Sequence, residues 1–257
     1  MLRCKNVGFV KILDIWFDEQ AFLEAREKII SLHSNAVLDN SKYDFKLTGQ
    51  TFLLDIARQE QDIFAGFDYK SCKYCINRAN RDGIRVWRAE NVTEKEKYLE
   101  FQNDFCEKKE IPKVDKNELE QLEVYCAETS DKEFLGGCAF IISDDYKTVR
   151  YKYGATCHKF NANEAILWEA IRSYHKRGFE IFDFGGCVLT DDRTSYYYRH
   201  YQFKKKFGGV LADSYTYFRI KGIYRICYFI FRSLVWFLFH GDVNSFILWL
   251  NKKGFIR

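Results

Sequence analysis

The stretch "NANEAILWEAIRSYHKRGFEIFDFGG" (residues 161–186) carries the clearest structural signal in the chain. Its first part has the apolar spacing of an amphipathic helix, with Asn163 as a candidate N-cap and Gly178 as the stop. An apolar strand follows over 179–186 and closes with two glycines, which permit a sharp turn and a close approach of another chain. A helix that leads directly into a buried strand is typical of a crossover in a sheet that carries helices on its faces.

The segments around this stretch predict further strands and helices. Strands are expected at 8–17, 49–56, 84–90, 121–128, 133–144, 148–157 and 213–220. Helices are expected at 18–35, 60–83, 93–110 and about 195–206. Three consecutive strands before the crossover helix indicate an antiparallel meander, so we predict an α/β fold with a mixed, mainly antiparallel sheet flanked by helices.

Composition and cysteine content restrict the class of protein. The chain has 257 residues with a net charge of +4, so any basic binding surface must arise from local clustering. Its nine cysteines are odd in number and scattered, which indicates a reducing compartment, and the start has no secretory signal. Cys72 and Cys75 form a single C-x-x-C without a second pair, so we expect no metal and a cytoplasmic protein.

A basic face is expected on the helix around residues 69–81. At 100° per residue, Lys70, Lys73, Asn77 and Arg81 fall on one side, with no evident acidic partner there. The face is either an ordinary solvated surface or a platform for phosphates of a nucleotide, a lipid pyrophosphate or a tRNA end.

Asp183 lies in the apolar strand between Phe182 and Phe184 and points away from both. A buried carboxylate needs a partner, and we expect Arg193 or Lys204 in that position. Asp183 is either a structural ion-pair residue or a residue that orients the attacking amine or a catalytic lysine.

Five motifs, in their order along the chain, resemble one family. They are "YKSCKYCINRANRDGIRVW" (69–87), "LGGCAFI" (135–141), "YKYGAT" (151–156), residues 165–186 and "FKKKFGG" (203–209). Together they resemble the FemA/FemB-type aminoacyltransferases, peptidoglycan bridge-forming enzymes with the GNAT-like fold of the GCN5-related N-acetyltransferases. The resemblance spans roughly residues 50–220 and implies that 49–221 form the acyltransferase domain and that 1–48 are a reduced N-terminal α/β segment. From their own composition, 222–257 are expected to form hydrophobic helices.

The same resemblance singles out the segment "YYYRHYQFKKKFGG" (196–209). Phe203 and Lys204 match the family's "FK" motif, which implies that Lys204 stabilises the oxyanion of acyl transfer or the terminal ribose–phosphate of the donor. Lys206 is a candidate phosphate ligand, Tyr197 a candidate for stacking on a base, and Arg193 a further substrate-binding candidate. The alternative for this segment is a solvated basic turn.

The expected donor follows from a missing motif. After the strand at 148–157 the chain reads "CHKFNANEA", without the glycines that cradle the pyrophosphate of acetyl-CoA in this fold. We therefore favour a donor other than acetyl-CoA, aminoacyl-tRNA in the family's case, and expect no cofactor.

The C-terminal tail (222–257) is the most hydrophobic part of the chain. Arg232 interrupts it, which argues against a membrane-spanning helix. The tail either lies at the inner membrane surface or packs on the domain itself.

Three functions remain open on the sequence. The first is an aminoacyltransferase that forms an amide bond on an amine of a lipid-linked or other cell-envelope precursor. The second is an N-acyltransferase with an acyl-CoA or acyl-carrier donor, acting on an amino sugar in surface-polysaccharide synthesis. The third is a catalytically silent GNAT-fold binding module.

Overall fold

One ten-stranded sheet runs through the computed structural model, which describes residues 2–7, 10–143, 145, 147–157, 159–227 and 230. The strands lie in the order β1-β2-β3-β10-β4-β9-β8-β7-β6-β5. Their bounds are β1 Leu2–Val7, β2 Val10–Trp16, β3 Ile29–Ser34, β4 Phe45–Asp55, β5 Arg85–Arg88, β6 Glu123–Glu128, β7 Phe134–Ile142, β8 Thr148–Thr156, β9 Ile181–Cys187 and β10 Val210–Ile220. Two pairs, β2–β3 and β8–β9, are parallel and the others are antiparallel, so the predicted mixed, mainly antiparallel sheet is confirmed.

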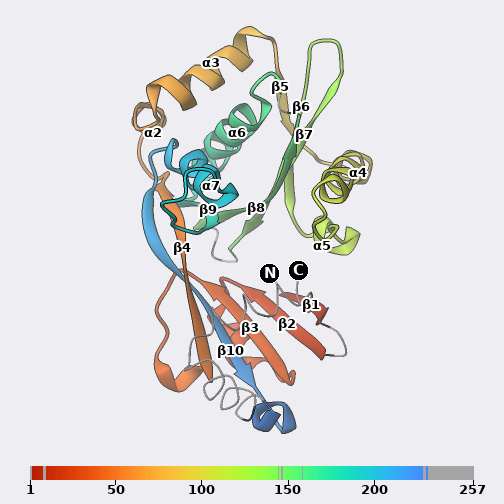
Figure 1. Cartoon of the computed structure of the whole chain (residues 1–257), viewed down its shortest axis with the longest axis vertical. Helices are drawn as coiled ribbons and strands as arrows, with labels where there is room; N and C mark the ends of the chain where they lie inside the picture. Colours follow the sequence, from red (N-terminus) through yellow and green to blue (C-terminus); the bar gives the residue numbers. More distant parts are fainter. Residues whose placement is uncertain are drawn as a thin grey trace.

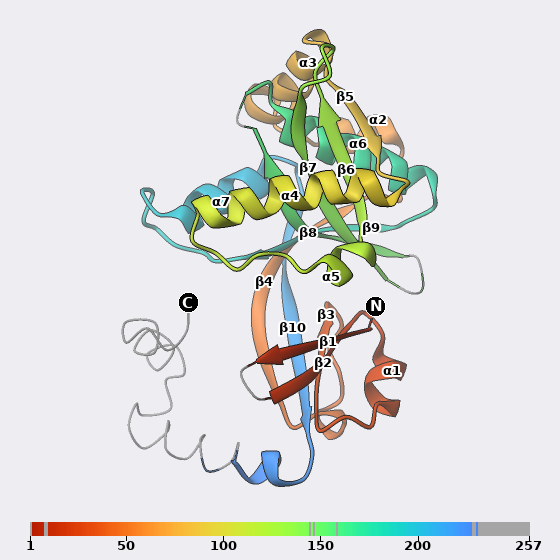
Figure 2. The ribbon, with the colours of Figure 1, turned by 90° about the vertical axis from the view of Figure 1, so that its right-hand side faces the viewer.

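The sheet passes through two lobes that share the long strands β4 and β10 (Figures 1 and 2). The large lobe holds β5 to β9 and most helices, and the small lobe holds β1 to β3 and α1. The helices are α1 Glu19–Glu24, α2 Glu60–Ala65, α3 Tyr74–Arg81, α4 Val92–Lys108, α5 Lys116–Glu120, α6 Ala162–Lys176 and α7 Tyr196–Lys205; the short helices η1 Asn40–Lys42 and η2 Tyr69–Lys73 precede β4 and α3.

Helices cover both faces of the large lobe's sheet, with α4 and α5 on one face and α2, α3, α6 and α7 on the other (Figure 1). The sequence of strand β6 shows why helices cover both faces of this sheet. Successive side chains of a strand point to opposite faces. Val124 and Cys126 pack in the cluster under α4 and α5, whereas Tyr125 and Ala127 pack in the cluster under α6. Both sides of the strand are therefore apolar, and its sequence is a continuous run of apolar residues instead of an alternation of apolar and polar ones.

The small lobe corrects one sequence-based expectation. Instead of one helix over 18–35, the chain forms α1, which Asp18 caps, and then the strand β3. Ile30 and Leu32 of β3 are buried against α1 and β10, and β3 bonds to β2 and β10 on its two edges. Pairing with strands distant in the sequence, together with two consecutive β-branched residues, overrides the helical spacing.

Other details also differ from the expectations. Helix α6 begins after Asn161, which has a left-handed backbone and makes no side-chain cap bond, rather than at Asn163. The expected boundary between 48 and 49 falls inside β4, which belongs to both lobes. Most of the tail, 228–229 and 231–257, lies outside the described residues. Among the residues that are described, no helix has the length and apolarity needed to cross a membrane.

Candidate active site

A cavity opens where strands β8 and β9 separate. The two strands pair over only three residues of β8, Thr148 to Arg150, and then β9 continues beside β4. Side chains of the unpaired part of β8, the end of β9 and helices α6 and α7 line a cavity of about 910 Å³. Separation of two parallel strands thus provides the space, and the two glycines after Phe184 form part of its wall.

Lys204, in the last turn of α7, lies in this wall and is 4% exposed. Its Nζ donates to the carbonyl oxygens of Gly185 at 3.0 Å and Gly186 at 2.5 Å. An ammonium group has three N–H donors, so one is left for a ligand in the cavity. The double glycine at the end of β9 therefore holds Lys204, the catalytic candidate in the motif "FKKKFGG" (203–209).

Position 185 requires glycine, because a side chain would not fit there. Its φ of 78° lies in the left-handed region, and a Cβ there would sit 3.0 Å from the Tyr151 carbonyl oxygen and 3.8 Å from Lys204 Nζ. Burial removes water from the ammonium group and, together with the nearby positive charge of Arg150, lowers the pKa of Lys204 from 10.5 to about 8. Lys204 remains a cation at neutral pH.

Asp183 is completely buried next to the cavity and does not line it. Its carboxylate accepts from Arg150 Nη1 at 2.9 Å, Asn35 Nδ2 at 3.1 Å, the Gly185 amide at 2.8 Å and the Thr51 hydroxyl. Its ion-pair partner is therefore Arg150, and the expectation of Arg193 or Lys204 was wrong. The sequence hid this pair because the parallel register that sets Arg150 beside Asp183 is a tertiary feature.

The cavity wall is strongly basic. Its described lining residues include the cations Lys109, Arg150, Lys152, Arg199 and Lys204. Glu164 is the one carboxylate among them, and it pairs with Lys206 at 2.5 Å. Arg150 is already paired with Asp183, and the four other cations give the wall a positive charge that favours an anionic ligand.

The structure separates the predicted substrate-binding residues into three groups. Phe203 lines the cavity beside Lys204. Lys206 does not line the cavity. Its Nζ lies 4.5 Å from the Phe203 ring centroid and forms an ion pair with Glu164. Arg193 and Tyr197 are exposed and do not line the cavity.

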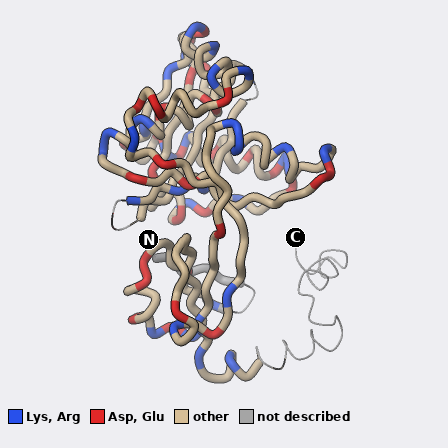
Figure 3. Tube along the Cα trace, turned by 90° about the vertical axis from the view of Figure 1, so that its left-hand side faces the viewer, with Lys and Arg blue, Asp and Glu red and all other residues tan. Residues whose placement is uncertain are grey.

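The third group forms a second hollow on the outer side of α3. Lys70, Lys73, Asn77 and Arg81 line it with Tyr69 and Tyr74, around a volume of about 460 Å³. The predicted common face of these four residues is confirmed. Lys and Arg positions, blue in Figure 3, gather at this end of the large lobe with acidic positions among them.

Sequence reasoning missed several residues of the wall, and three of them lie together at the small lobe's side of the cavity. Arg150 and Lys152 alternate along β8, and Trp16 comes from the small lobe, with its indole 4.1 Å from Lys152 Nζ and stacked on His33. The alternation "RYKY" is a visible signal of a shared face. Only the strand order shows that this face opens to the cavity.

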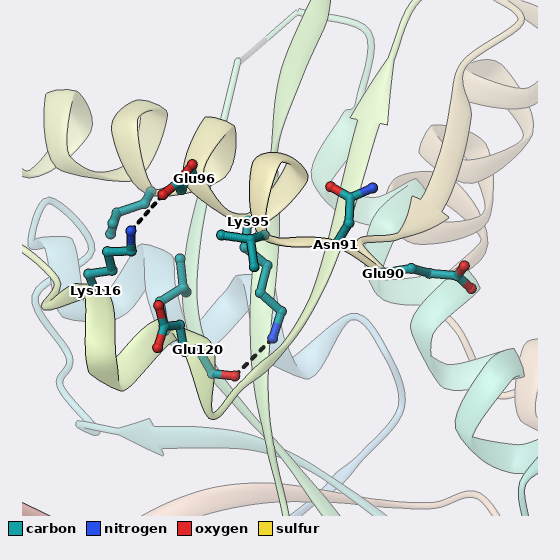
Figure 4. A pocket seen from close by; sticks show the side chains of 9 residues that line it. Glu90, Asn91, Lys95, Glu96, Lys116 and Glu120 are labelled. Atoms are coloured by element: carbon teal, nitrogen blue, oxygen red, sulfur yellow. Dashed lines mark hydrogen bonds and ion pairs between the residues drawn. The ribbon is translucent and has the colours of Figure 1, made fainter.

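A smaller hollow of about 300 Å³ lies between α4 and α5 (Figure 4). Lys95 donates to the carbonyl oxygens of Glu120 at 2.9 Å and Leu122 at 2.7 Å, and Lys116 pairs with Glu96 at 2.6 Å. These contacts join the two helices, so we assign no ligand to this hollow.

Cys157 is the cysteine among the described lining residues of the cavity. Cys187, a conceivable nucleophile, does not line the cavity, and burial raises the pKa of its thiol. His158, a conceivable base for it, lies outside the described residues.

Solved structures share this architecture although the sequences have diverged. The crystal structure of FemX matches with a TM-score of 0.64 at 13% identity, covering 88% of this chain and 85% of that chain. The chain has the FemX fold. The C-terminal domain of a putative lysylphosphatidylglycerol synthetase from Agrobacterium fabrum matches with a TM-score of 0.55 at 13% identity, over 91% of this chain and 85% of that one. L-PGS from Bacillus licheniformis matches with a TM-score of 0.57 at 10% identity, over 86% and 81% of the two chains.

The resemblance inferred from the five motifs is thereby confirmed at the level of the fold. No protein-family model and no curated protein matches the sequence.

Proposed function

We propose that this protein is an aminoacyltransferase that forms an amide bond on an amine of a cell-envelope precursor, with aminoacyl-tRNA as the donor. The observation that carries the proposal is the Lys204 ammonium group, fixed by two carbonyl oxygens in the wall of a basic cavity. Attack of an amine on an ester carbonyl produces a tetrahedral oxyanion. A positioned cation with a spare N–H stabilises that oxyanion without reorganisation.

Retention of this charge argues against a silent binding module. A lysine that is charged while 4% exposed destabilises the folded protein, as its lowered pKa indicates. Residues that reduce stability persist where function requires them. An enzyme therefore explains the buried ammonium better than a module that only docks on a partner.

The donor is proposed from the distribution of charge. Five cations line the cavity, and the hollow on α3 adds three more with two exposed tyrosines, Tyr69 and Tyr74. An acyl-CoA carries its phosphates at one end, whereas a tRNA presents phosphates over a long surface. Tyrosines among cations also suit stacking on bases and contact with phosphates. We therefore assign the cavity to the aminoacyl 3′ end and the α3 hollow to the RNA backbone.

The envelope acceptor is supported by the resemblance to FemA/FemB-type enzymes and by the name of one protein of the same fold. Lysylphosphatidylglycerol synthetase is named for a product that joins an amino acid to a lipid. A lipid-linked acceptor at a membrane surface is therefore part of this proposal.

Donor binding tests the proposal directly. The protein is titrated with an RNA microhelix that carries a non-hydrolysable, amide-linked aminoacyl group, and separately with acetyl-CoA. We expect saturable binding of the microhelix, weakened at least tenfold in Lys204→Met, and ribonuclease-sensitive transfer from aminoacyl-tRNA to amine acceptors. Binding of acetyl-CoA alone would support the N-acyltransferase on amino sugars, and binding of neither would support the silent module.

The α3 assignment has its own test. Lys70 and Arg81 are exposed and have no ion pair within the described part of the chain. In Lys70→Glu/Arg81→Glu we expect a higher KM for aminoacyl-tRNA, with a salt dependence reduced by about two phosphate contacts. The KM for an aminoacylated CpA dinucleotide should not change. Lys108→Glu/Lys176→Glu carries the same charge change on exposed sites elsewhere and should behave as the wild type.

A further inference from the structure

The proposed reaction needs a proton acceptor that the Lys204 assignment does not supply. An alkylammonium acceptor must lose a proton before its nitrogen can attack the ester carbonyl. The lysines, arginines and tyrosines of the cavity wall are ordinarily protonated at neutral pH and cannot take that proton. Among the described lining residues, a carboxylate, Glu164, and an imidazole, His200, are the groups whose basic form is ordinarily present there.

The contacts distinguish between these two candidates. Glu164 Oε1 is bound to Lys206 Nζ at 2.5 Å, and this pair is 14% exposed on each side. His200 has no carboxylate partner in the described structure and contacts the hydroxyl of Tyr196, with Nε2 and Oη 3.1 Å apart. His200 is therefore the better placed acceptor.

Tyr196, His200 and Lys204 form a stripe along α7. They are spaced four residues apart, so they lie on one face of the helix, and all three line the cavity. The rings of Tyr196 and His200 lie 4.7 Å apart at 30°, which fixes their relative orientation. One helical face thus places a proton acceptor one turn from the ammonium that receives the oxyanion.

The electrostatic surroundings keep His200 neutral. Burial lowers the pKa of His200, and the positive charge of Lys204 lowers it further. Arg199 lies next to it on α7, and Lys152 of β8 and the Glu164–Lys206 pair face the same cavity. The groups around the imidazole are thus cationic or already paired.

Resting on the proposed function, we propose that Tyr196 and His200 form a proton relay that deprotonates the acceptor amine. The ammonium transfers a proton to the Tyr196 oxygen as the Tyr196 hydroxyl proton passes to His200 Nε2. The neutral amine attacks the ester carbonyl, and the C–N bond forms. The tetrahedral intermediate collapses with cleavage of the C–O bond, its nitrogen loses its second proton to solvent, and the leaving ribose oxygen takes the proton from His200.

The pH dependence of kcat/KM tests the relay in the full-length protein with aminoacyl-tRNA and a primary amine acceptor. In the wild type we expect an acidic limb below pH 6.5, the ordinary pKa of histidine, because the His200 pKa is lowered. His200→Gln should lower the rate at pH 7 by about 10²–10⁴-fold and move the acidic limb toward the pKa of the free amine. Tyr196→Phe should show the same shift, and added imidazole should partly restore His200→Gln.

Tyr198→Phe is the matched control, because Tyr198 lies on the same helix and does not line the cavity. It should keep the wild-type profile. A wild-type profile in His200→Gln, with Lys204→Met inactive, would overturn the relay and leave the proposed function standing. Absence of transfer by the wild type would overturn the proposed function itself.

Discussion

Replacement of Lys204 by methionine separates the stability of this fold from its activity. Methionine keeps an unbranched side chain of similar length and removes the buried charge. The lowering of the Lys204 pKa from 10.5 to about 8 corresponds to about 3 kcal/mol by which the charged group destabilises the folded state at neutral pH. Loss of two hydrogen bonds to Gly185 and Gly186 opposes this gain by about 1–3 kcal/mol.

The sign of the pH dependence follows from the same values. The unfolded chain keeps the proton of Lys204 up to about pH 10, whereas the folded protein releases it near pH 8. Between these values the unfolded state binds more protons, so the wild type becomes more stable as pH rises. Relative to Lys204→Met, its free energy of unfolding should increase by about 2 kcal/mol from pH 7 to pH 9.5.

Urea denaturation of both proteins at the two pH values measures this difference. Transfer activity of the variant should fall by about 10²–10³-fold, because one oxyanion-stabilising group is lost. Lys108→Met, at an exposed lysine outside the cavity and the α3 hollow, is the control and should show neither effect. A difference in stability that does not change with pH would refute the buried ammonium, and full activity of Lys204→Met would refute its role.

Three further predictions concern residues of β9. Gly185→Ala should lower stability by about 1–2 kcal/mol and also lower activity, because the added Cβ meets the Tyr151 carbonyl oxygen and disturbs the bond to Lys204. Gly178→Ala, also at positive φ but with open space around the new Cβ, should cost stability alone, as thermal denaturation can show. Asp183→Ala should destabilise the protein by about 3–5 kcal/mol, because Arg150, whose side chain is 12% exposed, loses its carboxylate partner. As a control, Glu107→Ala removes one partner of the exposed Glu107–Lys113 pair and should leave the Tm unchanged. Phe182→Ala should cost about 3–5 kcal/mol in urea denaturation, since its ring is fully buried among Phe140, Tyr174 and Phe184.

The sequence predicted best those features that depend on local patterns. The meander β6–β8, helix α6 and strand β9 have periodicities that one chain segment carries by itself, and the basic face of α3 follows from helical spacing alone. Phe203 and Lys204 were found through the motif in which they lie. Features that depend on strand order could not be predicted, because no local pattern in Ile29–Ser34 indicates that this segment pairs with both β2 and β10. For the same reason the sequence could not show that Arg150 pairs with Asp183 or that Trp16 lines the cavity.

The position of β10 has a consequence for the synthesis of the chain. Tyr215 of β10 pairs with Ser34 of β3 and with Thr48 of β4, so the last described strand fills a gap between two of the earliest. While the ribosome adds the residues between them, β3 and β4 have unpaired edges that invite association with other chains. Contacts over such sequence separations form slowly. We therefore expect chains that end between residues 205 and 210, before β10, to need chaperones, even though they contain every lining residue of the candidate active site.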